Sequence, residues 1–308
     1  MQNFYFYRAH GLDIKSIIKF PELIPGNGNN NVVIHFEGHE FLNDLQPLEK
    51  NNGLYKFVNN VYDITYFFDD IPFFNIKNGT EIILNPEIFS ESKFSLPYIR
   101  SLILGVGFGV LLMQQGHLVL HASAVNVNGN AIAFLGNSGS GKSTMATFLS
   151  KKGYPLITDD VLVSKMDEKY QPFVVPSFPK VKIWADTIEF LDENNDKIQI
   201  HPEIKKYFYG VHNYSKLELM PLKVIYIIED SIKNEIVLLK HQDALISVLK
   251  NMYCINILDN DTYRKSIDFF QCVDLIKNVP VKSLRMIKTF ESMETLSKLI
   301  EEDINCII

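Results

Sequence analysis

Eight consecutive residues carry the strongest structural signal in the chain: Gly136-Asn137-Ser138-Gly139-Ser140-Gly141-Lys142-Ser143. They fill every fixed position of the phosphate-binding loop pattern G-x-x-x-x-G-K-[ST]. Glycines let such a loop turn back on itself and aim backbone N–H groups inward, where they hold phosphate at the positive end of the next helix. Lys142 adds a mobile cation, and the Ser143 hydroxyl can bind Mg²⁺. We expect these residues and Thr144 to form a nucleotide site.

The flanking sequence places this loop between a strand and a helix. Ala131 to Leu135 is a short apolar run typical of a buried strand. Lys142 to Lys152 carries apolar residues at 145, 148 and 149, which is the spacing of one helix face. A chance Gly/Ser-rich turn is the alternative, and this strand–loop–helix context argues against it.

Two adjacent carboxylates follow the next predicted strand. Pro155 to Thr158 reads as that strand and leads directly into Asp159-Asp160. Crowding two carboxylates is unfavourable unless a cation or a proton offsets them, and a bound Mg²⁺ would do so. A solvated turn with a helix-capping Asp is the alternative. Because neighbours on a strand point to opposite faces, we expect the two carboxylates to have different roles.

A predicted hairpin brings a histidine towards the loop. Asn128-Gly129 separates two apolar runs, so Leu118 to Val127 is predicted to pair antiparallel with Asn130 to Leu135. This places His121 on the strand beside the one that leads into the loop. The histidine can contact a phosphate or an acceptor, or it can have a purely structural role.

The first 95 residues alternate short apolar runs with polar turns. We expect a mostly antiparallel β-rich N-terminal domain over residues 1–95, with loops at Pro25 to Asn30 and Asn51 to Gly53. Its aromatic residues suit a half-buried sheet better than a peptide-binding face. The predicted strands are Phe4 to Tyr7, Val32 to Phe36, Leu54 to Val58, Val61 to Phe68 and Glu81 to Leu84.

Residues 96–308 read as an α/β domain with a mixed sheet around the loop. An uncharged run of twelve residues, Leu102 to Met113, is too short to span a bilayer and is expected to be a core helix over residues 97–115. Residues 186–216 read as a long connection and a candidate lid. Leu222 to Glu229 and Glu235 to Lys240 read as a strand pair. Further elements are predicted as strands at 161–165, 173–175, 181–184 and 281–286, and helices at 244–252, 262–272 and 292–302.

Composition narrows the class of protein. With 308 residues and 46% hydrophobic content, the chain can form one large or two ordinary domains. A net charge of −6 argues against a nucleic-acid partner. Cys254, Cys272 and Cys306 form no pair with disulfide or zinc spacing, and no signal peptide is read at the N-terminus. We therefore expect a cytoplasmic protein with no membrane partner; self-association into a homo-oligomer is compatible with the sequence.

These motifs together resemble a known family. The segments His121-Ala-Ser-Ala-Val, Gly136 to Thr144 and Ile157-Thr-Asp159-Asp160 are similar to the C-terminal catalytic domain of HPr serine kinases, including the 15 residues from His121 to Gly136 and the 23 from Gly136 to Asp159. The resemblance implies a fold like that of phosphoenolpyruvate carboxykinase. The segment Pro176 to Asp186 and the opening Tyr7-Arg-Ala-His-Gly-Leu look more like the kinases of lasso-peptide precursors.

One segment departs from the family. Where an HPr kinase is expected to carry Leu-Glu-Ile-Arg-Gly, this chain has Val181-Lys182-Ile183-Trp184-Ala185, without the Glu or the Arg. The departure argues against phosphorylase activity and against HPr as the substrate. Two interpretations of Lys182 are open: it stands in for the lost Arg, or it is a surface lysine beside Trp184. Asp186 is a further candidate substrate contact.

The resemblance implies an ATP- and Mg²⁺-dependent serine kinase. Its acceptor would be a peptide or small protein, foremost the C-terminal Ser of a ribosomal-peptide precursor, captured by the N-terminal domain. Asp159 would accept or orient the acceptor proton, Ser143 and Asp160 would hold Mg²⁺, and Lys142 and His121 would contact phosphate; the two aspartates could have the reverse roles. The alternatives are a bifunctional HPr kinase/phosphorylase, a small-molecule kinase and a non-kinase ATP-binding or ATP-hydrolysing module.

Overall fold

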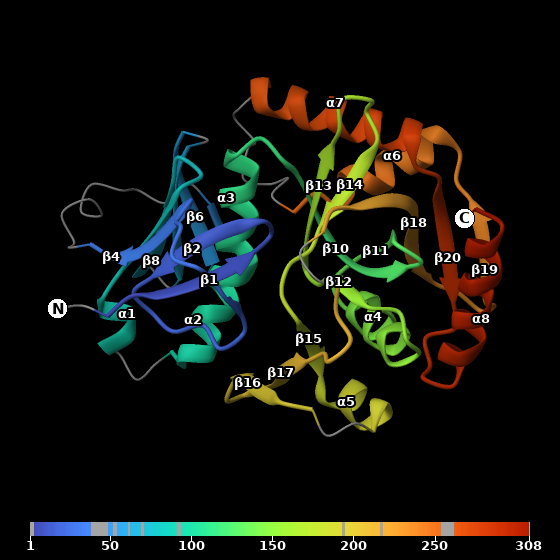
Figure 1. Cartoon of the computed structure of the whole chain (residues 1–308), viewed down its shortest axis with the longest axis horizontal. Coiled ribbons are helices and arrows are strands. Elements are labelled where there is room, and N and C mark those ends of the chain that lie inside the picture. Colours follow the sequence, from blue (N-terminus) through green and yellow to red (C-terminus); the bar gives the residue numbers. More distant parts are fainter. Residues whose placement is uncertain are drawn as a thin grey trace.

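The structure is a computed structural model that describes residues 3–37, 49–51, 54–60, 62–68, 71–90, 94–192, 195–215, 218–253 and 262–307. A nine-stranded sheet and an eight-stranded sheet lie on either side of a long helix, and a three-stranded sheet extends below the second (Figure 1). Both large sheets contain parallel and antiparallel pairs. The fold is therefore mixed α/β, as the sequence predicts.

The nine-stranded sheet is built from the first 84 residues. Its order is β3-β1-β2-β4-β9-β8-β7-β6-β5, and a short helix, α1 (Glu87–Ser90), follows it. Two pairings, β2 with β4 and β4 with β9, are parallel, and the others in the described residues are antiparallel. The mostly antiparallel sheet is confirmed, with additional strands at β2, β3, β5 and β8. The strands are β1 (Tyr5–Ala9), β2 (Leu12–Ser16), β3 (Ile24–Pro25), β4 (Val32–Phe36), β5 (Glu49–Asn51), β6 (Leu54–Asn60), β7 (Asp63–Phe68), β8 (Ile71–Lys77) and β9 (Glu81–Leu84).

The aromatic residues of this sheet divide between core and surface. Tyr7, Tyr66 and Phe67 are buried, as expected for a half-buried sheet. In contrast, the segment Phe4–Phe6 exposes all three of its rings. The prediction that the aromatics are core is therefore wrong for these three, because β1 lies near the edge of the sheet, where only β3 flanks it on the outer side. The side chain of Phe68 and residues 52–53 of the predicted loop lie outside the described part.

A continuous helix runs between the two large sheets. It comprises α2 (Leu96–Leu102), a π-helical segment η2 (Ile103–Gly107) and α3 (Phe108–Gln114), and the Ser95 hydroxyl caps it by accepting from the Tyr98 N–H. Its 19 residues are long and apolar enough to cross a membrane, but 72% of the apolar window is buried inside the protein. The core helix predicted over residues 97–115 is therefore confirmed, with its ends shifted by one residue.

The helix is tied to both large sheets. Arg100 donates its Nε–H to the carboxylate of Glu22 at 2.9 Å, and both side chains are buried. Phe108 and Leu111 belong to one apolar cluster that also contains residues of β4, β8 and β9 and of the second sheet. Burying such a continuous cluster stabilises the contact between the sheets.

The second sheet surrounds the predicted loop. Its order is β11-β10-β13-β14-β18-β20-β19, and β11 also pairs with β18, so its first five strands close on themselves. The hairpin is confirmed, since Val127 pairs with Asn130, and Asn128 and Gly129 have φ of 51° and 82°. The strands are β10 (Leu118–Val127), β11 (Asn130–Leu135), β12 (Leu156–Thr158), β13 (Val161–Met166), β14 (Pro172–Val175), β18 (Met220–Asp230), β19 (Glu235–Leu238) and β20 (Val281–Met286).

Two predictions on connectivity are wrong. Residues 186–216 are not a long irregular connection: they contain α5 (Ala185–Leu191), β16 (Lys197–His201) and β17 (Ile204–Gly210), and the strands form the small sheet with β15 (Lys180–Trp184). Strand β17 buries Phe208 and Tyr209, and this burial stabilises it despite its polar neighbours. In addition, β18 and β19 do not pair with each other, because β20 inserts between them.

Four helices cover the second sheet. Helix α4 (Lys142–Lys151) follows β11, α6 (His241–Lys250) and α7 (Thr262–Asn278) lie along the top in Figure 1, and α8 (Ser292–Asn305) lies beside β19 and β20. Cys272 is buried in α7 and Cys306 is exposed, both as free thiols, and Cys254 lies outside the described residues. The helices after residue 240 agree with the prediction, although α7 extends beyond it.

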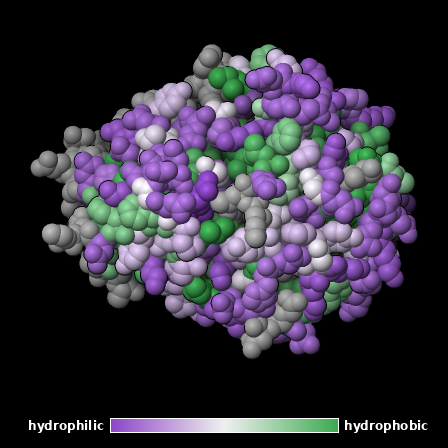
Figure 2. All heavy atoms as spheres, in the orientation of Figure 1, coloured by the Kyte–Doolittle hydropathy of each residue, from purple (hydrophilic) through white to green (hydrophobic). Residues whose placement is uncertain are grey.

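The turn between β1 and β2 packs against the second half of the chain. His10 is fully buried, with its ring 5.9 Å from that of Phe108 and 6.1 Å from that of Phe178. The visible face of the molecule is mostly hydrophilic, with hydrophobic residues in small separate groups (Figure 2). The division into a substrate-recognition domain (1–95) and a catalytic domain (96–308) stays a prediction.

Candidate functional site

The predicted loop, Gly136–Ser143, is hereafter the glycine loop. It connects β11 to α4, so the predicted strand–loop–helix order is confirmed. Gly139 has φ of 79°, and Gly141, the residue before the helix, has φ of 102°. These left-handed conformations strain any residue with a Cβ. The loop therefore depends on glycine at these two positions to direct its backbone into the first turn of α4.

One asparagine anchors the glycine loop to the neighbouring strand. The side-chain oxygen of Asn251, just after α6, accepts from the Gly136 N–H at 3.0 Å, and its backbone oxygen accepts from the His121 N–H at 2.8 Å. Its side-chain nitrogen donates to the Ser247 oxygen at 2.8 Å. Asn251 is buried, so all these bonds are shielded from water. The residue fixes the start of the loop relative to β10.

Lys142 folds back over the glycine loop. Its Nζ donates to the backbone oxygens of Gly136 at 2.8 Å and Asn137 at 3.1 Å. Burial lowers the pKa of Lys142, and the negative charges of Asp159 and Asp160 partly offset this effect. The Lys142 amine therefore lies beside the loop backbone, where it can pair with an anion bound by the glycine loop.

Both aspartates line the same cleft. Strand β12 ends at Thr158, and the Val161 N–H donates to the Asp159 oxygen at 2.9 Å, which makes a tight turn at Asp160 with φ of 70°. The expectation that the two carboxylates point to opposite faces of a strand is therefore wrong. The turn after the strand rotates Asp160 into the cleft that Asp159 also faces.

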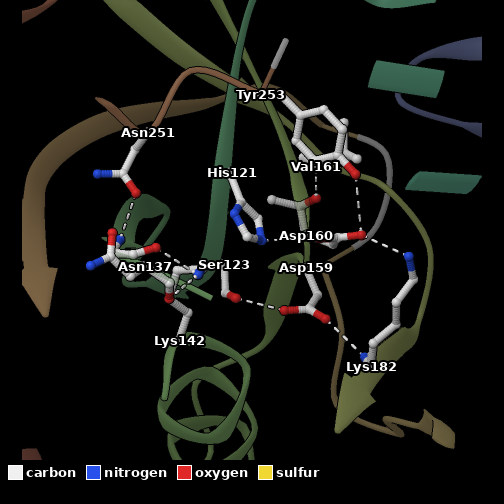
Figure 3. Close-up of polar contacts among 12 residues, drawn as sticks. His121, Ser123, Asn137, Lys142, Asp159, Asp160, Val161, Lys182, Asn251 and Tyr253 are labelled. Carbon is white, nitrogen blue, oxygen red and sulfur yellow. Dashed lines mark hydrogen bonds and ion pairs between the residues drawn. The ribbon is translucent and has the colours of Figure 1, made fainter. Parts of the chain in front are cut away.

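Asp159 is held by two hydrogen bonds. Its Oδ1 accepts from the Ser123 hydroxyl at 2.6 Å, and its Oδ2 accepts from the backbone N–H of Lys182 at 2.9 Å (Figure 3). The residue is almost completely buried. Ser123 lies two residues after His121 on β10, so the two side chains emerge on the same face of that strand. The carboxylate is fixed in orientation by groups from two different strands.

Asp160 is held by charged partners. Its Oδ1 lies 3.2 Å from His121 Nε2, its Oδ2 accepts from Lys182 Nζ at 2.7 Å, and the Tyr253 hydroxyl lies 3.5 Å from the same oxygen (Figure 3). Burial alone would raise the pKa of Asp160, but the attraction of Lys182 and the contacts with His121 outweigh it and hold the pKa well below its ordinary value. Asp160 is therefore ionised at neutral pH.

These side chains share one cleft of about 360 Å³. Its lining includes the aspartates, His121 and residues 138–144 of the glycine loop and α4. The lining also has an apolar part, Met286, Phe290 and Met293, and the rings of Phe290 and Phe190 stack with centres 4.6 Å apart. Basic side chains from different segments border the cleft: Lys142, Lys182, Lys206 and Lys288. The combination suits a ligand with a strongly anionic part and a flat apolar part.

The structure thus brings the predicted site residues together, and their contacts differ from one residue to the next. Gly136 and Asn137 contribute carbonyl groups to Lys142, and Thr144 contacts the Thr187 hydroxyl at 3.2 Å. Asp186 lies at the exposed rim, where it accepts from the Thr187 N–H at 2.7 Å. Lys182 is not a surface lysine beside Trp184, since it is paired with Asp160.

The donor types in the cleft fit Mg²⁺. Among the residues that the structure describes, no group of three or more His, Cys, Asp or Glu side chains is arranged to hold a metal. Magnesium ions do not need such a cage, because they are usually bound by one or two carboxylates together with substrate phosphates. Asp160 already binds one cation, the Lys182 ammonium, at 2.7 Å. Its carboxylate is therefore charged, and a bound Mg²⁺ would share it with Lys182 or displace that ammonium.

Comparison with known proteins adds an independent observation. No protein-family model matches the chain. The HPr kinase/phosphorylase of Mycoplasmopsis pulmonis (strain UAB CTIP) is 31% identical over 144 residues, which cover 42% of this chain and 45% of that protein. Over that stretch the chain resembles HPr kinase/phosphorylase.

The chain spans less than half the length of this curated relative. Among solved structures, the HPr(Ser) kinase/phosphatase from Coxiella burnetii aligns with a TM-score of 0.31 and 11% identity, over 61% of this chain and 98% of that chain.

Several residues of the site were missed by sequence reasoning. Ser123 could have been found, because its spacing of two from His121 places both on one face of a strand. Asn251 and Tyr253 carry no local signal, since they reach the site through backbone pairing of residues 251–253 with β10. Lys206 belongs to the segment that was predicted to be irregular. Gly105 lies in the middle of the buried helix, where nothing in the sequence links it to the aspartates.

Proposed function

We propose that the protein is an ATP-dependent kinase that transfers the γ-phosphoryl group to a serine hydroxyl of a peptide or small protein. The observation that carries this proposal is the presence of Asp159 and Asp160 in the same cleft as the glycine loop. A phosphate-binding loop alone supports only nucleotide binding. A positioned carboxylate pair facing it adds the groups that phosphoryl transfer to a hydroxyl requires.

ATP would lie along the length of the cleft. The triphosphate would contact the glycine loop and the first turn of α4, where backbone N–H groups and the helix dipole favour anions. Lys142 would leave the loop carbonyls and pair with a phosphate, since a charged partner offsets the burial that lowers its pKa. The base would lie against the apolar part of the lining, beside Met286, Phe290 and Met293.

Asp159 is the better candidate for the residue that receives the acceptor proton. The Lys182 and His121 contacts hold the pKa of Asp160 low, which makes Asp160 a weak base but a strong fixed charge. In the transfer, the serine oxygen forms a bond to the γ-phosphorus as the bond to the β,γ-bridging oxygen breaks. The bridging oxygen leaves with ADP, and the serine proton passes to Asp159, whose orientation Ser123 fixes.

Mg²⁺ would be held by Asp160 and the Ser143 hydroxyl, and when bound it neutralises charge on the β- and γ-phosphate oxygens. Lys182 lines the same cleft, and its ammonium donates to the Asp160 carboxylate and to the Ser101 backbone oxygen. His121 contributes a ring nitrogen to the same carboxylate. These groups keep Asp160 ionised and fixed before the substrates arrive.

The acceptor we favour is the tail of a ribosomal-peptide precursor, such as that of a lasso peptide, in the cytoplasm. The departures from the HPr kinase pattern support this choice. Lys182 pairs with Asp160, and Trp184 is exposed at the cleft with the Lys206 ammonium 5.5 Å from its ring centre. An exposed aromatic residue and a cation beside the transfer site suit a flexible peptide substrate.

The proposal is tested with [γ-³²P]ATP and a library of serine-containing peptides. Lys142→Ala should abolish labelling, because it removes the cation of the glycine loop, and Asp159→Asn should do the same, because the amide is no longer a base. Matched controls are Lys152→Ala, at the other end of α4, and Asp167→Asn, in a surface turn. Both controls should label peptides as the unaltered protein does. Retained transfer in Asp159→Asn would remove that residue from the proposed role.

The 31% identity with a protein named HPr kinase/phosphorylase favours a second candidate, a bifunctional enzyme that acts on HPr. The two candidates differ in the reverse reaction. Incubation with phosphoserine-HPr and inorganic phosphate should yield pyrophosphate only if the second candidate is correct. We expect no pyrophosphate, since the segment around Lys182 lacks the Glu and the Arg that the family resemblance leads one to expect.

A further inference from the structure

A second cavity, of about 230 Å³, adjoins the nucleotide cleft. It lies between the helix formed by α2, η2 and α3, hereafter the central helix, and the small three-stranded sheet. Its described lining contains no residue of the glycine loop. The lining consists of Tyr98, Ser101, Leu102, Gly105, Val106, Lys182, Ile200, His201, Ile204, Lys206 and Tyr253. We refer to it as the helix-side cavity.

The helix-side cavity and the nucleotide cleft share a wall. Lys182 and Lys206 line both. The Lys182 ammonium is bonded to Asp160, which faces the cleft, and the Tyr253 hydroxyl, which faces the helix-side cavity, lies 3.5 Å from the same carboxylate. In Figure 3, Tyr253 and Lys182 both point towards Asp160. A group entering from the helix side therefore meets the proposed transfer site at this carboxylate.

Gly105 leaves space at this wall. A Cβ at this position would lie 2.9 Å from the Tyr253 hydroxyl, 3.0 Å from Lys182 Nζ and 3.2 Å from Asp160 Oδ2. Its backbone is helical, within the π-helical segment, so glycine is not required there by a left-handed φ. Because glycine has no Cβ, the helix backbone can instead lie close to Tyr253, Lys182 and Asp160 without a steric clash.

The chemistry of the lining indicates what it can bind. Leu102, Val106, Ile200 and Ile204 provide an apolar surface, and Tyr98 extends it. The two lysines are at the side that faces the nucleotide cleft. A ligand that fits therefore has an apolar group for the body of the cavity and a hydroxyl or anionic group at its charged wall.

We propose that the helix-side cavity binds an apolar side chain of the acceptor peptide, next to the serine that is phosphorylated. This inference rests on the proposed kinase function. The apolar residue would fill the space beside Leu102, Val106 and Ile204, and the serine would reach past Tyr253 towards the aspartates. ATP and acceptor would thus enter from different sides of the Lys182–Asp160 pair, and the serine would pass this pair to reach Asp159 in the nucleotide cleft. The cavity selects serines with a large apolar neighbour.

A positional-scanning library of serine peptides tests the inference. For the unaltered protein, one position near the serine should prefer Leu, Ile or Phe over charged residues by about tenfold or more, as apolar pockets discriminate. Ile204 lies at the start of β17 and is 41% exposed, so Ile204→Glu should fold. In this variant the preference for apolar residues at that position should be lost, and Lys and Arg should be preferred instead.

The matched control is Ile232→Glu, because Ile232 is 96% exposed between β18 and β19, outside the cavity lining. Its selection should equal that of the unaltered protein. Labelled peptides without an apolar preference, or an unchanged preference in Ile204→Glu, would overturn the inference and leave the kinase function standing. ATP binding without transfer to any peptide would overturn both.

Discussion

Replacing Lys182 with methionine tests whether the Asp160 carboxylate is held ionised by that lysine. The substitution keeps most of the side-chain length but removes the ammonium that lies 2.7 Å from Asp160 Oδ2 and 3.1 Å from the Ser101 oxygen. Exposed ion pairs contribute about 0–1 kcal/mol, and breaking a buried pair costs about 3–5 kcal/mol. The two side chains here are 15% and 22% exposed. We therefore expect Lys182→Met to lower the free energy of unfolding by about 2 kcal/mol at pH 7.

The loss should depend on pH in a definite direction. The folded-state pKa of Asp160 is depressed, so the stabilisation is fully present above the unfolded-state pKa of about 3.9 and is lost as the pH falls towards the folded-state value. The difference in free energy of unfolding between the unaltered protein and Lys182→Met should therefore be smaller at pH 3.5 than at pH 7, by about 0.7 kcal/mol. Urea unfolding curves at the two pH values measure it.

A matched control is available on the surface. Lys233 lies 2.7 Å from Glu235, the same separation as in the internal pair, but its side chain is 65% exposed. Lys233→Met should leave the unfolding midpoint unchanged within error, because solvent screens the pair. If Lys182→Met behaves in the same way at pH 7, with no change on acidification, then Lys182 does not hold Asp160 ionised, and the proposed division of roles between the aspartates is wrong.

Three further substitutions probe other parts of the structure. Gly105→Ala should reduce kcat/KM for peptide phosphorylation by tenfold or more, on the order of 1.4 kcal/mol, because its methyl group would displace the Tyr253 hydroxyl and the Lys182 ammonium from Asp160; Gly107→Ala, whose Cβ would make only ordinary contacts, should have no such effect. Asn251→Ala should cost about 1–3 kcal/mol in urea unfolding, since it leaves a buried N–H of the glycine loop without its acceptor; an unchanged midpoint would contradict the anchoring. Burial lowers the pKa of His10 to about 3, so its contribution to stability is full above about pH 6.5 and falls as the pH drops. Between pH 7 and pH 5, the free energy of unfolding of the unaltered protein should therefore fall by about 2 kcal/mol relative to that of His10→Phe. If the two proteins lose stability in parallel, the buried ring is not neutral.

The sequence predicted the site better than it predicted the parts around it. The glycine loop, the hairpin at Asn128-Gly129 and the acidic pair could be placed because each is short and its geometry is set by neighbours in sequence. Strand β2 is not among the predicted strands, although Leu12 and Ile14 alternate with polar residues and are buried. In the small sheet, β15 agrees with the strand predicted at 181–184, but β16 and β17 lie in the segment predicted to be a connection, because most of their residues are polar or exposed.

Other features depend on contacts between distant segments. The turn that rotates Asp160 into the cleft needs a left-handed residue after β12, and a carboxylate at that position gives no clear warning of it. The pairing of Lys182 with Asp160 and the approach of Gly105 depend on how the central helix packs. Neither has a local pattern, because both are set by the burial of an apolar cluster that spans the two large sheets.

The most direct test of the central claim is a balance of products. The protein is incubated with [γ-³²P]ATP and the serine peptide library, and phosphoserine, inorganic phosphate and ADP are measured together. The proposed function predicts that labelled phosphoserine accounts for most of the ADP formed and that both disappear in Lys142→Ala. If ADP forms while nearly all the label appears as inorganic phosphate, the protein is a module that hydrolyses ATP, and the claim that this cleft phosphorylates a hydroxyl is contradicted.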